Sequence, residues 1–302
     1  MKSIATCIMR GRSSAVLIAA TTAVLFWLFP PFLIVSGAVV ALVTLRHGPA
    51  EGALLVALAG LGATVLTTLV VGAPWPMVQI LAVCWLPLWI LALVLRATVS
   101  LARTLQVAAA MSLAGVLGFY GVLGDPAIWW EGVLGRWERE LAALAPTADR
   151  STLNQVLELL KGWAPFMSGQ MVSAALLFVV LGLLLGRWWQ ALLFNPGGFR
   201  PEVHELRLGR PLALLMLALF GAALLTGWMP LTNGVLVLGT LYTVQGVALA
   251  HALVFKLQLS SAWLLLFYLL LFPLLSQLVM ALGIADAWAD FRGRVRPRLD
   301  KR

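Results

Sequence analysis

Two long uncharged stretches limit what this chain can fold into. No charged side chain occurs from Ser13 to Leu45, and none occurs from Leu54 to Leu95. One helix of about 20 apolar residues already spans the hydrocarbon core of a bilayer. Hydrophobic residues make up 62% of the chain and charged residues 11%. The sequence therefore predicts an integral membrane protein, and its continuous rather than alternating apolarity favours helices over a β-barrel.

The expected fold is all-α, a polytopic transmembrane helical bundle in which residues 1–302 form a single integral membrane domain. The candidate spans are 14–29, 32–45, 52–72, 77–95, 104–124, 168–186, 211–229, 233–255 and 261–283. Pro30 and Pro31 either separate two short helices or kink one long helix, because proline lacks the backbone N–H. This alternative decides the parity of the topology.

Basic residues give the expected orientation. Lys2, Arg10 and Arg12 precede the first apolar run, which we interpret as an uncleaved membrane segment with a cytoplasmic N-terminus. Treating 14–45 as two crossings places the basic loops near 96–103 and 187–210 on the same side. The basic tail, 287–302, lies on the same side as these loops only if one apolar piece enters and leaves the membrane on one side. The glycine-rich piece 233–255 is one candidate, which gives about eight crossings with an uncertainty of one.

Segment 125–165 is expected to be an amphipathic interfacial loop on the outer side. Trp130, Leu134 and Trp137 begin an apolar stripe with helical spacing, and a second stripe includes Val156 and Leu160. Such helices, with tryptophan on the apolar face, lie in the membrane interface. The loop either rests on lipid or covers an outward-facing cavity.

Small residues recur at helical spacing. Ala15, Ala19 and Ala23 form a stripe that lets another helix approach closely. The stripe serves either internal packing or the docking of a partner membrane subunit. Glycines at 115, 118, 121 and 124, and at 182 and 186, predict further close helix packing.

The loop 187–210 is the most distinctive local sequence. Trp188 and Trp189 are typical of an aromatic belt, and Asn195 opens an Asn-Pro-Gly-Gly turn. Arg200 and His204 follow it. We expect this loop to bind lipid headgroups or a cytoplasmic partner. The His204 region lacks the histidine spacing of zinc enzymes, so no metal site is expected.

Few polar residues lie inside the apolar runs. Tyr242 and Gln245 share a helix face, and His251 lies nearer a helix end. They either bond between helices or line a ligand pocket. No acidic or lysine side chain lies in the middle of a span, which argues against a proton- or sodium-driven transporter.

Several function classes have no signal in the sequence. Paired carboxylates, a Ser/His arrangement and metal-ligand clusters are missing, so we expect no enzyme, no catalytic residues and no cofactor. The P-loop motif of ATPases is also missing. The net charge of +9 reflects topology, and no nucleic-acid-reading element accompanies it. Cys7 and Cys84 are too few for a disulfide framework.

An apolar N-terminal pair, the amphipathic 125–165 loop, the Asn195–Phe199 turn and the basic tail together resemble the YybS-like family of uncharacterised bacterial membrane proteins. That family is similar to the S components of energy-coupling-factor vitamin transporters. S components dock on a membrane coupling subunit through an alanine stripe, which Ala15, Ala19 and Ala23 match. This chain is longer and has more segments than an S component.

The sequence thus predicts a bacterial inner-membrane protein that acts as a small-molecule-binding or transport-related subunit without its own ATPase. The expected partners are the lipid bilayer, a small-molecule ligand and a membrane coupling subunit. The alternative is a non-transporting scaffold that recruits a cytoplasmic partner through the 187–210 loop and the basic tail.

Overall fold

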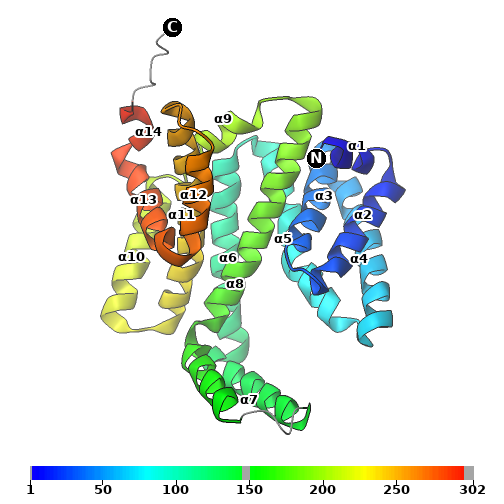
Figure 1. Ribbon diagram of the computed structural model, residues 1–302, viewed down its shortest axis with the longest axis vertical. Helices are drawn as coiled ribbons and strands as arrows, with labels where there is room; N and C mark the ends of the chain where they lie inside the picture. Colours follow the sequence, from blue (N-terminus) through cyan, green and yellow to red (C-terminus); the bar gives the residue numbers. More distant parts are fainter. Residues whose placement is uncertain (1, 145–149, 296–302) are drawn as a thin grey trace. The chain divides into compact units, whose positions relative to one another are not determined.

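The computed structural model describes residues 2–144 and 150–295, and these residues form helices and short connections (Figure 1). Five helices are long and apolar enough to cross a membrane: α4 (Pro49–Val71), α5 (Trp75–Thr98), α6 (Leu101–Leu123), most of α8 (Arg150–Phe194) and α11 (Met229–Lys256). The bent pair of α1 (Lys2–Ile8) and α2 (Arg12–Val24), the latter extended to Trp27 by a 3₁₀ turn, gives a sixth candidate. The all-α class and the multi-pass membrane character are thereby supported.

The described residues divide into two compact units. One unit contains 2–109, 175–213 and 240–295, and the other contains 110–144, 150–174 and 214–239. Each unit is built from several segments of the chain. The expectation of one integral membrane domain over 1–302 stays a prediction.

In the first unit, α2, α4 and α5 pack around α3 (Phe32–His47), and α1 packs against α2. Pro30 and Pro31 separate α2 from α3, which resolves the alternative in favour of two helices. Most residues of α3 are buried, and Ser36 donates a hydrogen bond of 2.8 Å to the carbonyl of Ala19 on α2. A helix enclosed by protein in this way need not match the bilayer thickness by itself.

The same unit ends in a short helical return. After α11, the chain forms α12 (Ala262–Leu270), a π-helical turn (Leu271–Leu275), α13 (Ser276–Ala289) and α14 (Phe291–Arg294). Lys256 at the end of α11 donates a 2.6 Å hydrogen bond to the carbonyl of Arg292 in α14. The apolar segment between them therefore starts and finishes at one end of α11, as Figure 1 also shows.

This return bears on which apolar piece enters and leaves the membrane on one side, which stays a prediction. The glycine-rich piece 233–255 is one candidate by sequence, but α11 is one continuous 28-residue helix there. Gly246 in this helix packs against Val279 of α13 so closely that a Cβ would overlap the backbone. The return lies in 262–289, where the π-helical turn interrupts the helix.

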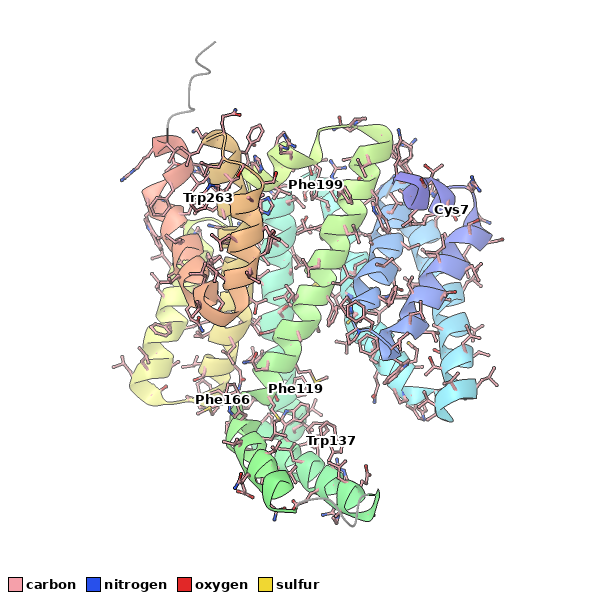
Figure 2. The ribbon with its side chains drawn as sticks, viewed as in Figure 1. Cys7, Phe119, Trp137, Phe166, Phe199 and Trp263 are labelled. Carbon is pink, nitrogen blue, oxygen red and sulfur yellow. The ribbon has the colours of Figure 1, made fainter. Side chains whose placement is uncertain are left out.

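The second unit contains α7 (Pro126–Leu144), the first half of α8, and parts of α6, of α10 (Arg210–Thr226) and of α11. The predicted amphipathic helices are present as α7 and the start of α8. Trp130 on α7 donates a 2.9 Å hydrogen bond to Ser168 on α8, and Leu134 and Leu157 are buried. Trp137 on the same helix remains about half exposed (Figure 2).

Asn233 on α11 fastens α8 in this unit. Its side-chain oxygen accepts a 2.9 Å hydrogen bond from the N–H of Gly169, and its amide nitrogen donates a 2.9 Å bond to the carbonyl of Pro165. In a regular α-helix those two backbone groups pair with each other. The asparagine thus bridges the helix one turn after Pro165, and α8 continues as one 45-residue helix through the proline.

Candidate functional site

A cavity of about 400 Å³ lies among the first four helices of the first unit. It falls within the size range of small-molecule sites, about 300–1,000 Å³. Its lining is Ile8, Met9, Gly11, Arg12, Ala15, Val16, Val43, His47, Glu51, Leu54, Leu55 and Leu58. The lining is therefore mostly apolar, with three polar or charged side chains.

The polar side chains gather where α2 and α4 begin. Arg12 opens α2, and Glu51 lies in the first turn of α4. Arg12 Nε donates to one Glu51 oxygen at 2.9 Å, and its Nη2 donates to the other at 2.5 Å. This two-point geometry fixes the plane of the guanidinium. His47, the last residue of α3, completes this end of the cavity.

Apolar residues continue the cavity along both helices. On α4 the lining runs from Glu51 through Leu54 and Leu55 to Leu58. Seven residues of α-helix advance about 10 Å. On α2 the lining passes from Arg12 to Ala15 and Val16. The cavity is therefore amphipathic, with a charged end and an apolar depth of about two helical turns.

The bend between α1 and α2 supplies the remaining wall. The chain bends by 118° between the two helices, and Ile8, Met9 and Gly11 at this bend all line the cavity. Ala5 and Ile8 anchor α1 by burial, whereas Cys7 on the same helix is partly exposed (Figure 2). The position of α1 thus determines the size of the cavity.

The alanine stripe faces the interior of the same unit. Ala15, Ala19 and Ala23 are buried, and α2 packs against both α3 and α4. This arrangement agrees with the internal-packing alternative. A partner subunit could reach the methyl groups of Ala19 and Ala23 only if α2 separated from its neighbours. The docking role stays a prediction.

The three polar residues proposed for ligand binding do not converge. Gln245 is fully buried, accepts a 2.7 Å hydrogen bond from the N–H of Leu208, and donates a 2.6 Å bond to the carbonyl of Gly283. Tyr242 is buried one turn away, and its hydroxyl has no hydrogen-bond partner in the described part of the chain. His251 pairs with the Tyr268 hydroxyl at 2.7 Å.

Helix geometry separates these residues. His251 lies six residues beyond Gln245, which at 3.6 residues per turn places it about 120° around α11. Gln245 instead joins the 205–209 connection to α13, and Gln106 on α6 bonds the carbonyl of the same Leu208 at 2.9 Å. The ligand role of these residues stays a prediction, and the contacts of Gln245 are those of a structural tie.

The predicted 187–210 loop is largely helical: residues 187–194 form the last turns of α8, and residues 199–204 form a further short helix. Charged side chains fasten this segment to the same unit. Trp189 is buried and Trp188 partly so, whereas Asn195 lies exposed at the turn. Arg187 pairs with Glu202, and the Arg200 guanidinium lies 4.9 Å from the centre of the Phe255 ring. Through these contacts, much of the 187–210 segment packs against its own unit.

His204 in α9 (Phe199–His204) lies beside the same phenylalanine, with 5.3 Å between the centres of the two rings. Burial lowers the pKa of His204, and the positive charges of His251, Arg200 and Arg292 lower it further. The neutral form of this imidazole is therefore favoured in the folded chain.

The sequence interpretation missed one buried ion pair. Asp286 on α13 lies 3.3 Å from the guanidinium of Arg292, and both side chains are almost fully buried. Arg292 also donates a 2.5 Å hydrogen bond to the carbonyl of His204. Asp286 lies just beyond the predicted span 261–283, and only the left-handed turn at Asp290 (φ 45°) brings Arg292 back to it. No spacing rule indicates that contact.

The described residues contain no group of three or more His, Cys, Asp or Glu side chains placed to hold a metal ion. Comparison with known proteins finds no matching family model, no similar curated protein and no similar solved structure. The resemblance to the YybS-like family stays a prediction.

Proposed function

We propose that this chain is a multi-pass protein of the bacterial inner membrane that binds a small amphipathic molecule, as a transport-related subunit without an ATPase of its own. The cavity between α1, α2, α3 and α4 carries the proposal. It is the right size for a small molecule, and it combines apolar walls with a charged end. Proteins that only pack as scaffolds have no need of such a space.

The orientation is proposed from the basic residues of the first unit. Contacts link them along one end: Arg12 to Glu51, Arg96 to the carbonyl of Leu45, Arg46 to the ring of Phe194, Arg200 to Phe255, Lys256 to Arg292, and Arg292 to His204. Positive charge concentrates on the cytoplasmic side of inner-membrane proteins. This end, with the N-terminus, is therefore assigned to the cytoplasm.

Eight crossings accommodate this orientation. They are α2, α3, α4, α5, α6, α8, α10 and α11, and α12–α13 returns to the cytoplasmic side. Three of them, α2, α3 and α10, are shorter than a full span. The segment of α7 and the start of α8 then lies on the outer side, where its exposed Trp137 and Trp163 suit the membrane interface.

Binding is tested by closing the cavity with one side chain. Leu58 lines the cavity and is half exposed, so Leu58→Trp should fill its apolar end. Leu61 lies on the same helix, is exposed and does not line the cavity, so Leu61→Trp is the matched control. The tagged variants are purified from their native membrane in mild detergent, and co-purifying small molecules and proteins are identified by mass spectrometry.

The proposal expects one stoichiometric small molecule with the wild type and with Leu61→Trp, and its loss with Leu58→Trp. Recovery of a membrane coupling subunit and ATPases in the same preparation would support the transport part. Recovery of no small molecule, with only soluble partners that depend on the 187–210 loop, would favour the scaffold instead.

A further inference from the structure

The charges at the polar end of the cavity indicate the chemical class of the ligand. We propose that the cavity takes an amphiphile with an anionic head, a carboxylate or phosphate, and one short apolar chain. The head lies at Arg12 and the chain lies between α2 and α4. This inference rests on the proposed function, because it assumes that the cavity is occupied.

Arg12 is the charged group that the site presents to a ligand. Its side chain is 69% exposed, compared with 29% for Glu51. Both Glu51 oxygens accept from Arg12, through Nε and Nη2. Within the described residues, the Nη1 donors of Arg12 have no hydrogen-bond acceptor. Glu51 thus orients the guanidinium, and Nη1 remains available for an oxyanion.

The surrounding charge favours an anion over a cation. Arg10 is exposed, and its neighbours Met9 and Gly11 both line the cavity. Arg10 and Arg12 together outweigh the single carboxylate of Glu51. A cationic head would meet this excess positive charge, and a neutral head would gain less from a charged donor than an oxyanion does.

The apolar depth sets the kind of tail. The lining extends about 10 Å from Glu51 to Leu58. Ala15 on the opposite wall is small enough to leave that space open. A two-chain phospholipid needs room for a second chain, whereas a volume of about 400 Å³ with one charged end suits a single short chain.

Photochemical capture tests the head and the tail separately. The full-length protein is placed in phosphatidylcholine nanodiscs with octanoic acid that carries a diazirine in its chain. Parallel samples receive the matching octyl phosphate, octanol and octyltrimethylammonium probes, and a two-chain phosphatidylglycerol probe. Cross-linked peptides are mapped by mass spectrometry.

The carboxylate and phosphate probes should label peptides from 8–16 and 43–58, and octanol and octyltrimethylammonium should label them far less. Arg12→Gln should lower capture of the anionic probes about tenfold, the loss expected for one charge-assisted hydrogen bond, while capture of octanol stays unchanged. Arg12→Lys should restore only part of the capture, because it restores the charge but not the two-point contact with Glu51. Leu58→Trp should abolish capture, and Leu61→Trp should not.

Two outcomes would overturn the inference but leave the proposed function standing. One is equal capture of octanol and octanoate that Leu58→Trp abolishes, which would mean a cavity without head-group selection. The other is equal capture of the phosphatidylglycerol probe, which would mean a bilayer lipid site. Absence of any capture at 8–16 and 43–58 would instead contradict the proposed function itself.

Discussion

The side-chain ammonium of Lys256 donates a 2.6 Å hydrogen bond to the backbone carbonyl of Arg292. The bond joins the end of α11 to the start of α14, across the whole apolar segment of α12 and α13. In a membrane, a segment whose two ends meet must enter and leave on the same side. Broken helices at membrane depth are tolerated where protein encloses them.

This contact predicts that both ends of the α12–α13 segment can be labelled from the same side of the membrane. In a variant with Cys7 and Cys84 replaced by serine, Ser260→Cys and Arg294→Cys should both react with a membrane-impermeant maleimide only from the cytoplasmic side. Asp125→Cys should react only from the outer side. Reaction of Ser260→Cys and Arg294→Cys from opposite sides would mean that α12–α13 crosses the bilayer.

The contact between α11 and α13 should be sensitive to a single methyl group. A Cβ at Gly283 would overlap the carbonyl of Tyr242 on α11, and backbone atoms cannot move aside cheaply. We expect Gly283→Ala to lower the free energy of unfolding by about 2 kcal/mol, the cost of overpacking. Gly118→Ala on α6, where a Cβ meets nothing within 4 Å, should be neutral or slightly stabilising. Equal thermal stability of the two variants would contradict the contact.

Asn233 should contribute more to the stability of the fold than one amide side chain usually does. It accepts from Gly169, and its nitrogen donates to Pro165 and, at 2.7 Å, to the Tyr120 hydroxyl. Asn233→Leu would leave these groups unpaired in an apolar setting, at about 1–3 kcal/mol for each group that finds no other partner. Chemical denaturation in detergent should show this loss. Gln170→Leu, at an exposed position in the same unit, should change stability by less than about 0.5 kcal/mol.

The lowered pKa of His204 predicts how stability depends on pH. Burial beside Phe255, together with the charges of His251, Arg200 and Arg292, disfavours the imidazolium in the folded chain. Between the folded-state pKa and the ordinary value near 6.5, the unfolded chain binds a proton that the folded chain does not. The stability contributed by neutral His204 is therefore complete above 6.5 and declines as the pH falls through this window.

Thermal unfolding between about pH 8 and about pH 5 measures this effect. His204→Asn should show a smaller fall of Tm on acidification than the wild type does. Glu205→Gln, at the next position, leaves His204 in place and should keep the wild-type slope. An unchanged slope in His204→Asn would exclude the histidine as the titrating group.

Most helix positions could be read from the sequence because charges and turn residues bound the apolar runs. The predicted 52–72 and 104–124 correspond to α4 and α6 within three residues at each end. Pro165 lies inside α8 without ending the helix, and the reason is a contact from another segment of the chain. Proline removes one backbone donor, but the Asn233 side chain supports the helix there from a distant segment. No residue near Pro165 in the sequence indicates that Asn233 is its partner.

The candidate site was harder to predict from the sequence, because it depends on which side chains become buried when the chain folds. Tyr242 and Gln245 are conspicuous as polar residues in an apolar run, yet Gln245 is occupied by the backbone of Leu208 and Gly283. Arg12 and Glu51 lie 39 positions apart and look like ordinary helix-end charges in the sequence. Only the packing of α2 beside α4 brings them together over an apolar cavity.

The central claim is that the cavity holds a small molecule, and an experimental density map tests it most directly. The protein should be purified from its native membrane in mild detergent and imaged without added ligand. The account predicts extra density between α2 and α4, with one end within hydrogen-bond distance of Arg12 and the other near Leu58. A map in which α1 and the side chain of Leu58 close this space, with no extra density, would contradict it.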